Sequence, residues 1–335
     1  MQEYNVVNME DVQELEHSSS FETQFRNRQE LNPAEGRFRY IDIKPEGLPD
    51  GSPLIFVPGW SITLDTEKQL LEDLHSAGKH TVSLEFPRFG GEVQKQANMP
   101  REVVRQAEMI NELIKLRPED KVDVVAQSMG VMDLITAVKL HPELLDRIGR
   151  VVFVSPAGIT GNDNFFKLLS RFGPHLAQDV ATALHSSNSR ENIFRMMKES
   201  NIYITKNPLR AVVGEAVAIA GSDMYEGLKD FQNAGIKVGI IQAEHDKLTP
   251  AKKLWSKIGE GSDPVSITLT QEEYEREKEQ YDKWNIKPGQ KVFNRHLNNQ
   301  VPPFDQITMV GGGHDNRIYS EPGFSKKILH QLSTL

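Results

Sequence analysis

The sequence contains no cysteine among its 335 residues, which excludes disulfide bonds, thiolate metal sites and a cysteine nucleophile. Basic residues are outnumbered, with 39 Lys and Arg against 47 Asp and Glu and a formal net charge of −8. This balance argues against a nucleic-acid surface as the main function. Long apolar runs are also missing, and no segment approaches the roughly eighteen apolar residues that span a membrane.

The N-terminus lacks the basic region and the apolar segment of a secretory signal, so we expect a cytoplasmic protein. What the sequence does contain is an ordinary globular composition, 38% hydrophobic and 26% charged. Its length is enough for one large α/β domain or two small ones.

Strand-like and helix-like patterns alternate along most of the chain. Strands are expected at residues 37–43, 53–57, 80–86, 122–125, 150–154, 236–242 and 306–310. Helices are expected at residues 63–77, 100–116, 131–138, 249–258 and 325–332. The alternation predicts a mostly parallel sheet with helices on both faces.

Three segments interrupt this alternation and divide the chain. Residues 1–35 are interpreted as an N-terminal arm on the surface, and residues 160–232, with helical patterns but no clear strand, as an inserted helical cap. Residues 259–304 carry a highly charged helical pattern, which favours a solvated surface excursion; an arm that docks a partner is the alternative. The α/β core then comprises residues 36–159 and 233–335.

The stretch from Lys121 to Val138 combines a short apolar run, a turn of small residues and a helical pattern. A strand, a tight turn and a helix in this order would lift the hydroxyl of Ser128 clear of the sheet. The first amide N–H groups of the helix would then point at whatever Ser128 attacks. Small residues are needed on either side of such a serine, and Ala126 and Gly130 occupy those positions.

Two further polar residues follow predicted strands. Asp246 comes after the strand at 236–242, and His314 comes after the strand at 306–310 and a run of glycines. A serine nucleophile needs a base and an acid that orients the base, and parallel strands bring their C-terminal ends to one edge of a sheet. Ser128, Asp246 and His314 therefore predict a catalytic triad.

Other interpretations of these residues remain open. Asp246 is also suited to capping the helix that follows it, and His314 to a structural role in its loop. Glu244 and Asp315 are alternative acids beside the predicted triad, whereas His245 is interpreted as structural.

The stretch around Ser128 resembles the nucleophile elbow of the α/β-hydrolase family, G-x-S-x-G, with Ala126 in place of the first glycine. The segment 57–60 is similar to the family's oxyanion loop, with Pro58 where histidine is commoner. Residues 85–90 are an imperfect match to its D-x-R-G-x-G turn. The segments 243–246 and 313–314 look like its acid loop and its C-terminal Gly-His pair.

The resemblance covers about residues 36–335 and implies an α/β-hydrolase fold with a helical cap. It also implies that the backbone N–H groups of Trp60 and Met129 are the oxyanion donors. The expected activity is hydrolysis of carboxylic esters by a Ser-His-Asp triad, without metal or organic cofactor. Ser128 attacks the acyl carbon, His314 transfers the proton and Asp246 orients His314.

The Phe, Leu and Met residues of the cap favour a small-molecule substrate with an apolar acyl or aromatic group, although most of them are expected in the cap's own core. The same triad also serves C–C bond, thioester, lactone and amide hydrolysis, acyl transfer and cofactor-free perhydrolysis. A different class of function, a non-catalytic α/β-hydrolase-fold protein that binds a ligand or partner, remains the alternative.

Overall fold

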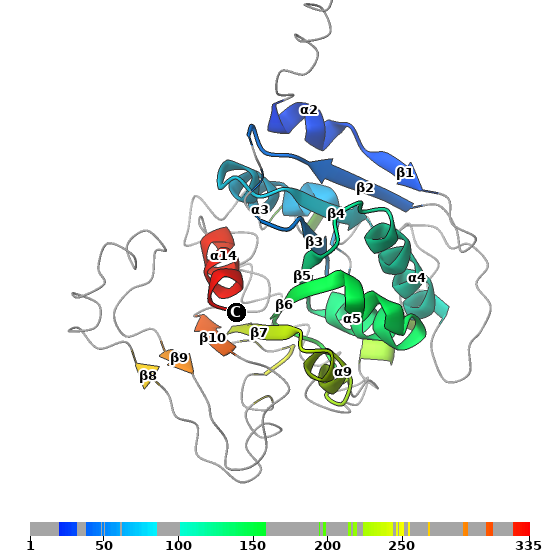
Figure 1. The fold of residues 1–335 in the computed structure, drawn as a ribbon, viewed down its shortest axis with the longest axis vertical. Helices are drawn as coiled ribbons and strands as arrows, with labels where there is room; N and C mark the ends of the chain where they lie inside the picture. The colour runs from blue at the N-terminus through cyan, green and yellow to red at the C-terminus, as the bar shows by residue number, and fades with distance from the viewer. Residues whose placement is uncertain are drawn as a thin grey trace, which may run out of the picture.

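A ten-stranded sheet forms the centre of the computed structural model (Figure 1). Its strand order is β1-β2-β4-β3-β5-β6-β7-β10-β9-β8. The structure describes residues 20–31, 38–47, 49, 51–60, 62–85, 101–158, 194, 197–198, 214–215, 217–219, 224–243, 246, 248–250, 254, 267–268, 291–293, 306–310 and 324–335.

The strands are β1 (Gln29–Leu31), β2 (Phe38–Ile43), β3 (Leu54–Val57), β4 (Thr81–Glu85), β5 (Val122–Gln127), β6 (Ile148–Val154), β7 (Lys237–Ala243), β8 (Ile267–Thr268), β9 (Lys291–Phe293) and β10 (Gln306–Val310). The α-helices are α2 (Phe21–Arg26), α3 (Leu64–Ser76), α4 (Arg101–Lys115), α5 (Met129–Leu140), α9 (Leu228–Asn233) and α14 (Phe324–Thr334). A 3-10 helix, η1 (Pro142–Arg147), precedes β6.

The central strands β4, β3, β5, β6, β7 and β10 pair in parallel, each with the next in the order given. The outer strands β1, β2, β8 and β9 pair antiparallel. The predicted mostly parallel sheet is therefore confirmed. β3 reads as a continuous apolar run because both of its faces are buried.

Helices cover both faces of the sheet. α4, α5 and α9 pack on one face and α3 and α14 on the other (Figure 1). Neighbouring residues of a strand face opposite layers, so Ile55 joins the first core and Phe56 the second. Within the described residues, no helix combines the length and the apolar character needed to cross a membrane.

Helix α3 ends as its sequence predicts. Gly78 follows the helix with φ of +81°, a conformation that is inexpensive only for glycine. Its N–H donates to the carbonyl of His75 at 2.9 Å, and the N–H of Lys79 donates to the carbonyl of Leu74 at 3.0 Å. This pair of hydrogen bonds is the Schellman motif, which provides donors for the last carbonyl groups of the helix.

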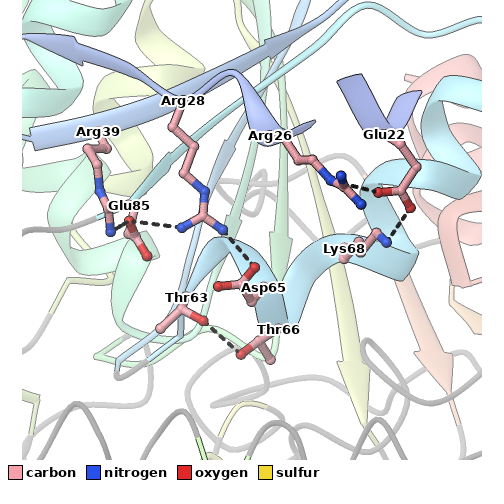
Figure 2. A network of polar contacts seen from close by, with 9 residues as sticks. All are labelled: Glu22, Arg26, Arg28, Arg39, Thr63, Asp65, Thr66, Lys68 and Glu85. Atoms are coloured by element: carbon pink, nitrogen blue, oxygen red, sulfur yellow. Dashed lines mark hydrogen bonds and ion pairs between the residues drawn. The ribbon is translucent and has the colours of Figure 1, made fainter. Parts of the chain in front are cut away.

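The described part of the predicted N-terminal arm, residues 20–31, forms α2 and the edge strand β1. Phe21 and Phe25 are one helical turn apart, and both are buried against α3 and β2. Figure 2 shows the polar contacts that accompany this packing: Arg28 bonds Asp65 at 2.6 Å and lies 3.9 Å from the buried carboxylate of Glu85. Residues 1–19 and 32–35 of the predicted arm lie outside the described residues.

The predicted charged excursion, residues 259–304, contributes two described strands. β9 pairs antiparallel with β10, and β8 pairs antiparallel with β9, so both extend the sheet past its parallel part. The sequence did not indicate them because strands of two and three residues are too short for a periodic pattern. The charged helix expected after Thr270 lies outside the described residues.

Most of α9 belongs by its residue numbers to the predicted cap, residues 160–232, and it packs against the sheet. Leu228 and Phe231 of α9 are fully buried, and Phe231 packs edge-on against Phe153 of β6 with ring centroids 6.0 Å apart. Leu228 and Phe231 lie one helical turn apart, so they place α9 in the layer of helices that covers the sheet. Most of residues 160–232 otherwise lie outside the described residues.

Buried ion pairs hold the sheet at the edge where its parallel strands begin. Asp42 bonds both His80 and Arg117 at 2.6 Å, and Arg150 bonds the buried carboxylate of Asp123 at 2.7 and 3.1 Å. Burial alone would raise the pKa of Asp42, but the hydrogen bonds from His80 and Arg117 outweigh it and lower the pKa to about 2.

Candidate active site

Ser128 lies at the tight turn between β5 and α5. Its backbone has φ of +49° and ψ of −116°, which a residue with a side chain adopts only under strain. The conformation is fixed by three backbone hydrogen bonds. The Ser128 N–H donates to Val154 at 2.9 Å, and its carbonyl accepts from Val131 at 3.2 Å and from Ala157 at 3.1 Å.

The turn leaves no room for a side chain at position 130. A Cβ atom there would lie 2.5 Å from the Pro58 carbonyl oxygen and 2.6 Å from that of Val57. Gly130 thus lets the first turn of α5 pass directly over the end of β3. This close approach is the steric reason for glycine that the sequence analysis predicted.

The segment predicted as the oxyanion loop lies against Ser128. A Cβ atom built on Gly59 would be 3.1 Å from the Cβ of Ser128. Met129 is the first residue of α5, so its N–H has no acceptor within the helix. The structure therefore brings Ser128, Met129 and the loop that carries Trp60 together, as the sequence predicts.

Asp246 is buried just beyond the end of β7. Its Oδ1 accepts bonds from the backbone N–H groups of Leu248 at 2.8 Å and Thr249 at 2.7 Å. Its Oδ2 accepts from the Thr249 hydroxyl at 2.6 Å and from the Gln242 amide at 3.3 Å. Asp246 therefore does cap the turn that follows it, which is the structural role the sequence left open.

The Asp246 loop and the Ser128 turn are joined through the end of β6. The Thr249 hydroxyl donates to the Ser155 carbonyl at 3.4 Å, and Ala157 of the same loop donates to Ser128. Ser155 also has a positive φ, +43°, and its N–H donates to the Ile241 carbonyl of β7. Adjacent strands β5, β6 and β7 thus deliver these residues to one edge of the sheet.

His314, the predicted base, lies outside the described residues, as do Glu244, His245 and Asp315. The strand that precedes His314 is described. β10 runs parallel to β7, with Val310 opposite Ala243, so both strands end at the edge that carries Ser128. In the described part of the chain, no group of three or more His, Asp or Glu side chains is arranged to hold a metal ion.

A pair of buried carboxyl groups near Ser128 was not identified from the sequence. Glu215 accepts the indole N–H of Trp60 at 2.7 Å and the side-chain amide of Gln106 at 3.0 Å. Asp133 of α5 is fully buried, and its pKa is held well above the ordinary range by burial and by the charge of Glu215. The sequence feature that could have identified them is that Asp133 and Glu215 are each a single acid within an otherwise apolar run.

Comparison with known proteins gives similarity at the level of fold. No protein-family model matches the sequence, and no curated protein matches it. An esterase from Exiguobacterium antarcticum aligns over 91% of this chain and 99% of its own, with TM-score 0.57 and 11% identity. An esterase from Thermogutta terrifontis aligns over 92% and 98%, with TM-score 0.55 and 14% identity.

A bromoperoxidase from Bacillus anthracis aligns over 92% of this chain and 100% of its own, with TM-score 0.55 and 14% identity. Together with the sheet order and the turn at Ser128, these similarities define the architecture. The chain has the α/β-hydrolase fold.

Proposed function

We propose that this protein is a serine hydrolase that cleaves carboxylic esters with Ser128 as its nucleophile. The observation that carries the proposal is the strained turn at Ser128, enclosed by Gly59 on one side and Gly130 on the other. A serine held in this way presents its hydroxyl beside the N-terminal amides of α5. Two of the structural neighbours are named as esterases, which supports the same class of reaction.

The reaction proceeds through an acyl-enzyme. Oγ of Ser128 attacks the acyl carbon while His314 takes its proton, and the oxyanion accepts bonds from the N–H groups of Trp60 and Met129. His314 then protonates the departing alcohol. Water, deprotonated by His314, attacks the acyl carbon and releases the acid and Ser128.

Asp246 is the acid in this scheme, although it already caps its own turn. A carboxylate accepts up to about four hydrogen bonds. At Oδ2 the bond from Gln242 is long, 3.3 Å, and the same amide also donates to the carbonyls of Ala243 and Thr249 at 3.2 and 3.0 Å. The imidazole N–H of His314 therefore competes with a weak donor only. The capping bonds meanwhile fix the carboxylate in place.

The test is hydrolysis of p-nitrophenyl esters of increasing acyl length, together with labelling by a fluorophosphonate. Wild type should hydrolyse at least one ester and be labelled once, and Ser128→Ala should lose both properties. Ser155→Ala is the matched control, because Ser155 also has a positive φ, at the next strand end, but no proposed chemical role. Its labelling should stay close to that of wild type.

Other outcomes separate the alternatives. Labelling of Ser128 without ester hydrolysis would contradict the ester substrate and direct the search to thioester, lactone, amide or C–C bonds. A folded wild type that is neither labelled nor active would contradict the hydrolase proposal and favour a non-catalytic binding protein.

A further inference from the structure

Glu215 is a carboxylate from the segment between β6 and β7 that reaches the loop beside Ser128. Its side chain is buried, with 3% of the residue exposed. Its two oxygens hold two different parts of the core: Oε2 accepts from the indole of Trp60, and Oε1 accepts from Gln106 of α4. Hydrogen bonds to an ionised acceptor are about twice as strong as neutral ones.

The surroundings strengthen these bonds because they exclude water. Met129, Met132 and Val103 form an apolar cluster with Ala218, and Trp60 and Ile219 pack against it. This cluster joins the helix that starts at Ser128 to the segment that carries Glu215. In such an environment of low dielectric constant, a bond to a carboxylate is worth more than at the surface.

Asp133 shows which of the two neighbouring acids carries the charge. Within the described part of the chain, neither of its oxygens has a hydrogen-bond partner, whereas Glu215 accepts from Trp60 and Gln106. A buried carboxylate without donors is far less stable than the neutral acid. Asp133 is therefore the neutral acid of the pair, whereas the two donors at Glu215 are suited to a carboxylate.

We propose that Glu215 is a positioning residue for the oxyanion loop, and this inference rests on the proposed function. It fixes the indole of Trp60 and thereby the backbone N–H of the same residue, which is the proposed oxyanion donor. A Cβ built on Gly59, next to Trp60, would lie 3.1 Å from the Cβ of Ser128, so the loop runs beside the serine and a small rotation of Trp60 moves its donor relative to the acyl carbon. Misplacement by about 1 Å is enough to lower a rate on the order of 100-fold.

Three substitutions test this role. Glu215→Ala removes both anchoring bonds and should lower kcat about 10- to 100-fold, with KM changed less than about threefold, because an oxyanion donor acts on the transition state. Glu215→Gln should keep kcat within about threefold of wild type, because its amide oxygen still accepts the indole N–H. The side-chain carbonyl oxygen of Gln106 has no hydrogen-bond partner among the described residues, so the Gln106 amide can turn and accept the new amide N–H.

Trp60→Phe removes the indole N–H and keeps an aromatic ring. It should lower kcat at least about fivefold, and it carries the test if Glu215→Ala does not fold. Glu226→Ala is the control, because Glu226 is an exposed acid of the same connecting segment that pairs with Lys229 on the surface. Its kcat should equal that of wild type.

Every kcat is expressed per site titrated with the fluorophosphonate. A residue that only stabilises the fold lowers the number of active sites, whereas a positioning residue lowers the rate at each site. If Glu215→Ala and Trp60→Phe both keep kcat per site within twofold of wild type, the positioning role is overturned. Failure of wild type itself to be labelled would instead overturn the proposed function.

Discussion

Substitution of Gly130 by alanine tests the geometry on which the candidate site depends. The added methyl group would meet two backbone oxygens, at 2.5 Å from Pro58 and 2.6 Å from Val57. Ordinary contacts begin at 3.4 Å, so α5 and the end of β3 must separate by about 0.9 Å. Backbone of a buried strand end cannot swing aside as a long side chain does.

Two effects of this substitution oppose each other. Alanine is the better helix former by about 1 kcal/mol, which would stabilise the first turn of α5. Overpacking a buried site typically costs about 1–3 kcal/mol, and the upper part of that range applies when backbone must move. The second effect is larger, so Gly130→Ala should lower the free energy of unfolding by about 1–2 kcal/mol.

Urea denaturation of Gly130→Ala beside wild type measures this change. The midpoint should fall with the slope unchanged, and fluorophosphonate labelling of the folded protein should slow, because the loop at residues 57–60 is displaced from Ser128. Gly47→Ala is the matched control, since nothing lies within 4 Å of a Cβ at that position. A Gly130→Ala protein as stable as wild type and labelled as fast would refute the packing described here.

Three further predictions concern the fold. Because the pKa of Asp42 is lowered to about 2, ionised Asp42 adds about 2 kcal/mol to the free energy of unfolding. This stabilisation is fully present above about pH 4 and is lost as the pH falls toward 2. Acid unfolding of Asp42→Asn beside wild type measures it. Arg150→Ala leaves the buried carboxylate of Asp123 without its bidentate partner and should cost about 3 kcal/mol in thermal or chemical denaturation. Phe25→Ala removes the ring that packs α2 against β2 and α3, and it should lower the free energy of unfolding by about 3 kcal/mol. Proteolysis near residue 20 should become faster, and an unchanged rate would contradict this packing.

The sequence predicted those parts of the fold in which a local pattern is long enough to read. The runs at Leu54–Val57 and Gln306–Val310 form strands as expected, and α3 (Leu64–Ser76) forms within the helix expected at residues 63–77. Leu54–Val57 is buried on both faces and α3 on one, so their apolar residues recur with the period of the element. The apolar pattern and the observed element agree because the same residues are buried when the element packs against the core.

Short elements were not predictable in the same way. α2, β1 and β8 have six, three and two residues, and β1 is mostly exposed. Their stability comes from the surfaces on which they dock, such as the packing of Phe25 on β2 and α3. Tertiary contact decides these segments, and it leaves no periodic trace in the sequence.

The candidate site also combines residues that a local sequence pattern reveals with residues that only the folded structure brings together. Ser128 and its glycine neighbour were recognisable because the turn imposes its residue types locally. The partnership of Glu215 with Trp60 joins residues 155 positions apart, so no local pattern encodes it. An acid isolated in an apolar run indicates only that a buried partner must exist, because a lone buried charge is unstable.

The choice of residue at the turn itself argues for chemistry at Ser128. Positive φ strains a residue with a side chain by about 1–3 kcal/mol, and glycine at the same position would carry no such strain. The chain does use glycine at 130, where a Cβ would collide with the backbone oxygens of Val57 and Pro58, and at 59, where a Cβ would lie only 3.1 Å from the Cβ of Ser128. Glycine at 128 would relieve this strain but would leave no hydroxyl at the N-terminus of α5. The strained position instead retains a hydroxyl, as expected if that hydroxyl is what the surrounding turn is built to present.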